Sequence, residues 1–251
     1  MKNKIKRLLL TIGSIVPVLM ISGCAHDGKP TFAFWVTNAD AMKYMEEKYG
    51  EKFILEDRKP SDIIYDEQTD VFCHTVDMDR NLNEHAKVYL LDDEKGVHFS
   101  DSYFGYYIRP QVEEYVYENL KDIYPEVKAF YTPGTRMIDD SLTTESTLDD
   151  YFDINENRLR INIFIKKDPD ITVDEYEASV KKAAEPFADR GNRWLLFFYV
   201  VSDNVYDKTD RKTELKLRER ISGHRLKDDE QVFMEVHMEI GKGEILSYKT
   251  F

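Results

Sequence analysis

The adjacent residues Cys73 and His74 have the side-chain types of a thiol nucleophile and its general base. They lie in the run 70–78, which is rich in β-branched and aromatic residues and predicts a strand. Successive side chains of a strand point to opposite faces, so this imidazole cannot activate this thiol. We therefore expect Cys73 to be a small core residue and not a catalytic one.

Oxygen-bearing side chains with the spacing of a calcium loop begin at Asp77. The pattern Asp77-x-Asp79-x-Asn81 brings alternate oxygens toward one point, as a hard cation requires. Leu82, however, stands where an EF-hand needs glycine, and Val88 where it needs a bidentate glutamate. A solvated turn is the better interpretation of this segment.

The six histidines show no H-E-x-x-H pattern. His98 and His237 occupy polar positions of alternating strand patterns, where exposed side chains are expected. His237 lies between Glu235 and Glu239 on one strand face, and these three could hold a metal only with a further ligand from elsewhere.

Two pairs of acids, Asp139-Asp140 and Asp149-Asp150, have the residue types of a glycoside hydrolase site, which needs carboxylates at a set separation across a cleft. In a chain with 48 acidic residues such pairs also arise from composition alone. The chain has no G-x-S-x-G elbow, P-loop or dinucleotide fingerprint. The sequence thus indicates no cofactor, no metal and no catalytic residue.

Aromatic residues cluster at the predicted strand-to-helix junction 101–110. A ring cluster with a neighbouring glycine can form a flat recognition surface for sugars or peptides. The alternative is a corner whose rings fill the core while their hydroxyls reach water. The candidate surface consists of Tyr103, Phe104, Tyr106 and Tyr107.

The chain begins with four cations in its first seven residues, followed by an apolar run at 8–20 that is too short to cross a bilayer. This run leads to Ser22-Gly23-Cys24, which resembles the lipobox of bacterial lipoproteins. The resemblance implies a signal peptide at 1–23 and a lipid on Cys24, the first residue of the mature protein. An uncleaved anchor with an incidental Cys24 is the alternative.

A lipid on Cys24 would make the membrane the first partner of this protein. Because a diacyl anchor holds a protein stably, no spanning helix is needed. The tether 24–30 is about 20 Å long at most, which keeps the domain close to the lipid surface. Ala25 lacks the inner-membrane retention signal of an aspartate at that position, so an extracytoplasmic place on the cell membrane or the outer membrane is expected.

The mature chain is strongly acidic. Removing residues 1–23 takes away four cations and leaves 31 Lys and Arg against 48 Asp and Glu, a formal charge of −17. Such a chain is repelled by phosphates, which argues against nucleic acid as a partner unless a local cationic patch overrides the net field. The full sequence is 42% hydrophobic, enough to bury a core, and if Cys24 carries a lipid only Cys73 remains, so no intramolecular disulfide is expected.

Helical and strand patterns occur in both halves of the chain, which predicts an α+β fold of mostly antiparallel sheets packed with helices. The expected organisation is a first α+β unit at 31–131, an acidic linker or loop at 132–157, and a second unit at 158–251. The two units could be similar in structure or form one domain. Residues 203–230 stay unassigned because their leucines favour a strand while the surrounding charges favour a helix. The expected helices are 37–49, 110–124 and a helix that follows Thr172 and ends or kinks at Pro186, and the expected strands are 52–56, 70–78, 86–91, 97–104, 127–131, 158–167, 194–201, 232–240 and 245–251.

A second resemblance comes from Ala41-x-x-Tyr44-x-x-x-Lys48-Tyr49-Gly50-x-x-Phe53 together with 97–107, which is similar to uncharacterised bacterial lipoproteins. It implies no known activity. The preferred hypothesis is a non-enzymatic binding or interaction module for an unknown peptide, protein or glycan. A solute-binding lipoprotein of a transporter and an envelope hydrolase are the alternatives.

Overall fold

Alternating apolar residues build two separate sheets, and helices with one apolar side cover them. The computed structural model describes residues 37–56, 71–76, 78, 84–134, 136–154, 158–188, 190, 192–226 and 231–251. Over these ranges it contains seven helices and two mostly antiparallel sheets, so the predicted α+β class is confirmed. Cys24 and the Asp77-x-Asp79-x-Asn81 pattern lie outside the described residues.

The four-stranded sheet has the order β1-β2-β3-β4 and is antiparallel throughout. Helix α1 (Asn38–Tyr49) packs on it through Ala41, Met45 and Tyr49. Thr37 and Asp40 form a reciprocal capping box at the start of α1, and Gly50 ends it in the left-handed conformation. The strands are β1 (Ile54–Leu55), β2 (Val71–His74), β3 (Ala86–Asp93) and β4 (Gly96–Asp101).

The five-stranded sheet has the order β5-β6-β7-β8-β9. Only β6 and β7 run parallel, and helix α5 (Val173–Ala188) connects them as a crossover. The β8–β9 hairpin turns through Lys242 and Gly243, both with positive φ, as a tight hairpin requires. The strands are β5 (Val127–Thr132), β6 (Arg158–Lys166), β7 (Arg193–Val201), β8 (Val232–Gly241) and β9 (Glu244–Thr250).

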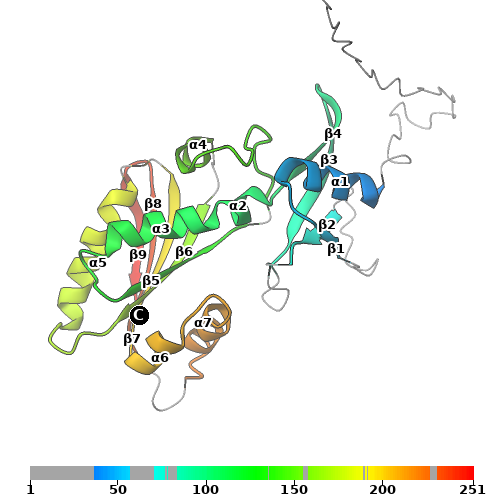
Figure 1. Ribbon diagram of the computed structural model, residues 1–251. Helices are drawn as coiled ribbons and strands as arrows, with labels where there is room; N and C mark the ends of the chain where they lie inside the picture. Colours follow the sequence, from blue (N-terminus) through cyan, green and yellow to red (C-terminus); the bar gives the residue numbers. More distant parts are fainter. Residues whose placement is uncertain are drawn as a thin grey trace, which may run out of the picture. The chain divides into compact units, whose positions relative to one another are not determined.

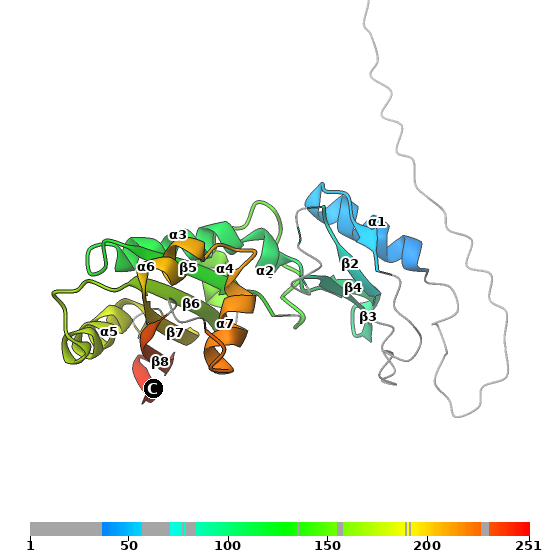
Figure 2. The same ribbon diagram turned by 90° about the horizontal axis from the view of Figure 1, so that it is seen from below.

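Both faces of this second sheet carry helices. Helices α3 (Arg109–Leu120) and α5 lie over one face, and α6 (Asp203–Lys208) and α7 (Glu214–Ser222) over the other (Figures 1 and 2). Under α3 and α5 the buried Trp194 stacks on Tyr115 and meets Phe187 edge to face. A smaller core under α6 and α7 is formed by Phe130, Phe164, Tyr199, Val201, Val205, Leu217 and Ile221.

The segment expected to be an acidic linker or loop, 132–157, contains helix α4 (Leu148–Ile154). Its Tyr151 and Phe152 are buried in the main core, as is Leu142, so this segment belongs to the folded body. The strand expected at 127–131 also pairs with β6 in the second sheet and not with the first. The apolar residues of 132–157 are buried by contacts with residues that are distant in the sequence. The polar composition of this segment therefore wrongly indicated a linker.

Smaller differences between the expected and the observed elements occur where helical and strand signals in the sequence compete. Strand β4 ends at Asp101, and the residues after it form the short helix α2 (Phe104–Tyr107) instead of extending the strand to 104. Helix α5 continues past Pro186 to Ala188, and the unassigned stretch 203–230 contains α6 and α7.

Candidate ligand-binding site

Cys73 and His74 are both buried within β2 and do not form a catalytic pair. Burial raises the pKa of the Cys73 thiol to about 12, so the thiol stays protonated at neutral pH. The His74 Nδ1 atom lies 3.8 Å from the Glu56 carboxylate. The burial of Cys73 agrees with the expectation that it is a small core residue.

His237, Glu235 and Glu239 follow one another on one face of β8, but they do not converge on a common point. The His237 Nε2 atom lies 2.6 Å from Glu235 Oε1. The Glu239 carboxylate instead accepts from Arg193 Nε at 2.5 Å and lies 3.3 Å from Arg158 Nη2. In the described ranges no group of three or more His, Cys, Asp or Glu is arranged to hold a metal ion.

The two aspartate pairs make local contacts. Asp150 accepts from the backbone and hydroxyl of Thr147 and so caps α4, and Asp149 pairs with Arg190. Asp139 accepts from the Ser141 amide, and Asp140 lies 3.7 Å from His98 Nε2. Capping and turn formation explain these carboxylates without a hydrolytic role.

The aromatic junction 103–107 does not form the exposed recognition surface considered above. Tyr103, Phe104 and Tyr106 are buried, and the half-buried Tyr107 donates to the carbonyl of Thr144. The Tyr103 ring meets Tyr49 and Phe53 edge to face. The alternative, a corner whose rings fill the core, therefore describes this segment.

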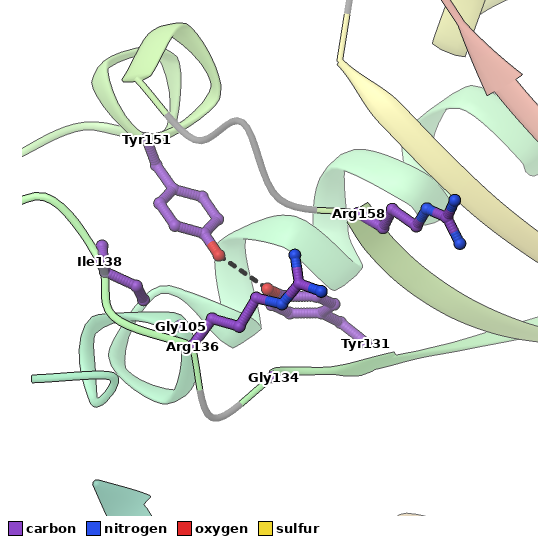
Figure 3. Close-up of a pocket in the computed structure, with 7 residues that line it drawn as sticks. All are labelled: Gly105, Tyr131, Gly134, Arg136, Ile138, Tyr151 and Arg158. Carbon is purple, nitrogen blue, oxygen red and sulfur yellow. Dashed lines mark hydrogen bonds between the residues drawn. The ribbon is translucent and has the colours of Figure 1, made fainter. Parts of the chain in front are cut away.

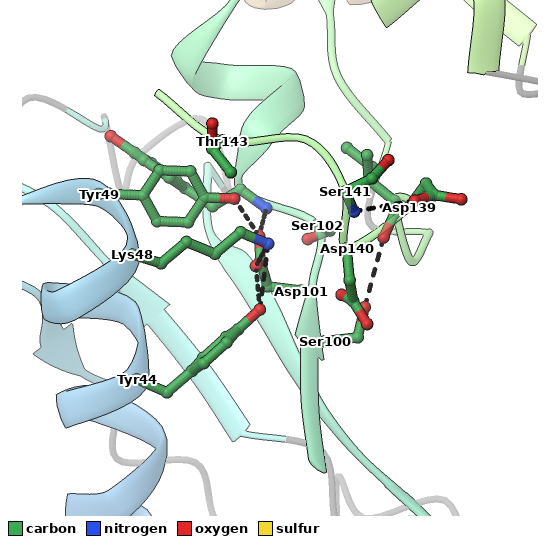
Figure 4. A network of polar contacts seen from close by, with 12 residues as sticks. Tyr44, Lys48, Tyr49, Ser100, Asp101, Ser102, Asp139, Asp140, Ser141 and Thr143 are labelled. Carbon is green, nitrogen blue, oxygen red and sulfur yellow. Dashed lines mark hydrogen bonds and ion pairs between the residues drawn. The ribbon is translucent and has the colours of Figure 1, made fainter. Parts of the chain in front are cut away.

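A buried carboxylate at the end of β4 organises the residues around α1 (Figure 4). Asp101 accepts hydrogen bonds from the Tyr44 hydroxyl, the Tyr49 hydroxyl and the Lys48 ammonium, each at 2.8 Å, and from the Tyr103 amide at 2.7 Å. Burial, and then the Asp101 charge, raises the pKa of both tyrosines. Because Asp101 is buried and accepts these four hydrogen bonds, the cluster is a fixed structural lock.

The last two residues of β4 extend this lock to the segment before α4. The Ile138 amide donates to the Asp101 carbonyl at 2.9 Å, and the Ser100 hydroxyl donates to the Ile138 carbonyl at 3.3 Å. These two hydrogen bonds hold segment 137–139 along β4 and so place Ile138 beside a pocket.

A pocket of about 340 Å³ lies between α2, the end of β5, α4 and the start of β6 (Figure 3). Its centre is the pair Tyr131 and Tyr151, whose hydroxyl oxygens are 2.7 Å apart. Gly105 leaves room beside them, because a Cβ there would lie 3.1 Å from the Pro133 Cβ and 3.6 Å from the Tyr151 hydroxyl oxygen. The described lining residues are Gly105, Tyr131, Gly134, Arg136, Ile138, Tyr151 and Arg158.

The charges at this pocket are positive, against the acidic balance of the whole chain. Arg136 and Arg158 line it, and none of the described lining residues is acidic. Figure 3 shows the Arg136 guanidinium near the tyrosine pair, whereas the Arg158 side chain extends away from it. Burial raises the pKa of Tyr131 well above its usual range, so its hydroxyl remains a neutral hydrogen-bonding group. Such a site can attract an anionic group and orient it.

Among the described helices, none combines the length and apolarity needed to span a bilayer. No family model matches the chain, and no curated protein is significantly similar to it. A solved structure of a DUF5037 family protein from Ruminococcus gnavus ATCC 29149 matches with 14% sequence identity and a TM-score of 0.41, over 82% of this chain and 93% of that one.

Proposed function

We propose that this chain is a lipid-anchored, extracytoplasmic binding protein whose pocket between α2, β5, α4 and β6 takes a small ligand with a carboxylate group. One observation carries the proposal. The exposed Arg136 guanidinium and the Tyr131–Tyr151 hydroxyl pair line the same cavity, without an acidic side chain among its described lining residues. Guanidinium groups bind carboxylates with two parallel hydrogen bonds, which gives both affinity and orientation.

The size and the remaining walls of the pocket narrow the ligand class. A volume of about 340 Å³ is at the lower end of the roughly 300–1,000 Å³ typical of small-molecule sites. Ile138 and the tyrosine rings add apolar surface to its lining. The best fit is a small molecule with one anionic end and one apolar end.

Binding of small carboxylates is tested by thermal shift and calorimetry on the soluble domain, with benzoate, phenylacetate and inorganic phosphate as probes. A bound carboxylate should raise the melting temperature, because selective binding to the native state stabilises it. Arg136→Gln and Tyr151→Phe should each weaken binding at least tenfold. Arg225→Gln, an exposed arginine on another part of the surface, is the matched control. Equal binding by wild type and Arg136→Gln would contradict the pocket assignment.

The anchor is tested separately, in cells supplied with a labelled fatty acid. Cys24→Ser should abolish both lipid labelling and retention in the membrane fraction, since the lipid is lost and the acidic domain is repelled by anionic lipids. Cys73→Ala should leave both unchanged, because this thiol is buried in β2. Labelling that persists in Cys24→Ser would disprove the anchor while leaving the pocket proposal intact.

A further inference from the structure

Strand β5 is an edge strand, and its pairing with β6 decides which of its main-chain groups are free. The Lys166 amide donates to the Glu126 carbonyl at 3.1 Å, which fixes the phase of the antiparallel ladder. In such a ladder, main-chain groups point alternately toward the partner strand and away from it. The amides and carbonyls of Val127, Ala129 and Tyr131 therefore point away from β6.

Side chains already bind the outward groups at one of these three positions. The Tyr131 amide donates to Glu113 Oε1 at 2.8 Å, and Arg211 Nη1 donates to the Tyr131 carbonyl at 3.0 Å. Glu113 and Arg211 also pair with each other. Together they occupy the place of a neighbouring strand and close this end of the edge.

The outward groups of Val127 and Ala129 make no hydrogen bond within the described part of the chain. Both residues line an open groove of about 570 Å³, Ala129 half-buried and Val127 buried. One wall of the groove is α3, and the other is the segment between α6 and α7. Its lining residues are Pro110, Glu113, Glu114, Tyr117, Val127, Lys128, Ala129, Phe130, Thr209, Asp210 and Arg211.

The charge that the groove presents is negative. The Lys128 ammonium is held by the carbonyls of Tyr206 at 2.7 Å and Thr209 at 2.9 Å, and Arg211 is paired with Glu113. Glu114 forms no salt bridge among the described residues. Neither does Asp210, whose Oδ1 accepts from the Lys212 and Thr213 amides and from the Thr213 hydroxyl. The lining thus carries three carboxylates, Glu113, Glu114 and Asp210, against the two cations Lys128 and Arg211, which leaves a net charge of −1.

We propose that the free edge of β5 binds a short extended peptide segment with basic side chains, which adds to the five-stranded sheet as a sixth strand. Strand addition supplies main-chain partners to Val127 and Ala129, which small molecules and glycans cannot do as a regular ladder. Glu114 and Asp210 provide the charge complementarity. The Glu113–Arg211 pair marks where the added strand must stop.

The test uses proline, which removes one amide without disturbing the rest of the ladder. Because the Ala129 amide points away from β6, Ala129→Pro is compatible with the fold of an edge strand. Thr250→Pro is the matched control, since its amide on the opposite edge strand β9 also points outward, as the Glu235–Phe251 pairing shows. Circular dichroism and thermal melting establish that both variants fold.

The probe is a fluorescent hexapeptide of alternating lysine and valine, blocked at both ends so that it carries no carboxylate for the Arg136 pocket. Anisotropy titration should show binding to wild type and Thr250→Pro and at least tenfold weaker binding to Ala129→Pro. A probe with alternate amides methylated should bind at least tenfold more weakly to wild type, which keeps the test valid if Ala129→Pro does not fold.

Three results would overturn the proposal. One is equal binding of the probe by wild type and Ala129→Pro. Another is equal affinity for a glutamate–valine hexapeptide, which would remove the role of Glu114 and Asp210. The third is a concentration-dependent dimer of wild type, lost in Ala129→Pro, that excludes the probe, because the occupant of the edge would then be a second copy of this chain.

Discussion

Asp101 shows how a single side chain can hold distant parts of the chain together. Its carboxylate is almost fully buried and contacts Tyr44 and Lys48, which lie 57 and 53 residues away in the sequence. One main-chain hydrogen bond, from the Ile138 amide to the Asp101 carbonyl, then connects Asp101 to the segment that borders the pocket. The Asp101 cluster and the pocket are therefore adjacent, and segment 137–139 connects them.

We expect Asp101→Asn to lower the free energy of unfolding by about 3 kcal/mol, because it leaves the Lys48 ammonium nearly buried without its counter-charge. Urea denaturation measures the change. Glu47→Gln on the exposed side of α1 should cost under about 0.5 kcal/mol, since its pair with Lys43 is a surface pair. Adding Lys48→Met to Asp101→Asn should recover part of the loss, and purely additive effects would contradict the pairing.

Gly105 controls the free space beside the tyrosine pair. Gly105→Ala places a methyl group 3.6 Å from the Tyr151 hydroxyl oxygen and should weaken carboxylate binding about tenfold. Its stability should change by less than about 1 kcal/mol, because the gain in helix propensity offsets the close contact with Pro133. Calorimetry on Gly105→Ala and Gly134→Ala checks this, since a Cβ at Gly134 meets only a backbone atom at 3.9 Å. Equal weakening in both variants would contradict a specific role for Gly105.

At the residue scale, positions governed by local rules were predictable and positions governed by distant partners were not. Cys73 was expected in the core because successive side chains of a strand point to opposite faces, which prevents a catalytic pair with His74. The Cys73 side chain is fully buried. The sequence around Arg136 contains only turn signals and gives no sign of a pocket. Its partners Tyr131 and Tyr151 come from a strand and a helix whose packing the sequence does not reveal.

At the scale of elements, long periodic segments were predictable and short ones were not. The alternation in 158–167 and 232–240 correctly identified β6 and β8. Helices α6 and α7 were missed because they are short and highly charged, and only Leu217 and Ile221 of α7 show helical spacing toward the smaller core. Tertiary burial, and not intrinsic propensity, stabilises such helices.

The capping box of α5 is an element whose contribution can be isolated. Thr172 Oγ1 accepts from the Glu175 amide. The Thr172 amide and hydroxyl both donate to the Glu175 carboxylate, and these two bonds lower the pKa of Glu175. Thr172→Ala should cost about 1 kcal/mol of stability, whereas Thr172→Ser should be close to wild type. Urea denaturation of the three proteins measures the difference. A loss in Thr172→Ser as large as in Thr172→Ala would show that the methyl group matters and the cap does not.

For the whole molecule, anchoring and charge act together. The proposed removal of residues 1–23 would give the chain a formal charge of −17, which an anionic membrane surface repels, so the lipid proposed on Cys24 would have to provide the attachment. The two proposed sites differ in sign, with Arg136 at the pocket and Glu114 with Asp210 at the β5 edge. One domain could then select an anionic small molecule and a basic peptide at separate places.

The many buried tyrosines predict that the protein unfolds in alkali. Burial raises the pKa of Tyr106 and Tyr124 to about 12, whereas a tyrosine in the unfolded chain ionises near pH 10. Between pH 10 and 12 the unfolded state therefore binds fewer protons than the native state, and each such tyrosine lowers the free energy of unfolding by about 1.4 kcal/mol per pH unit.

Arg211 acts in the opposite direction, since burial lowers its pKa to about 10 and its native form loses a proton before the unfolded form does. The several tyrosines outweigh this one arginine, so the net slope above pH 10 should be negative. Urea denaturation at pH 9, 10 and 11, followed by tyrosinate absorbance, measures the slope. Tyr124→Phe should make it shallower by about 1.4 kcal/mol per pH unit, because one titrating group is removed. A stability that stays constant from pH 9 to 11 would show that these hydroxyls are not shielded as the structure places them.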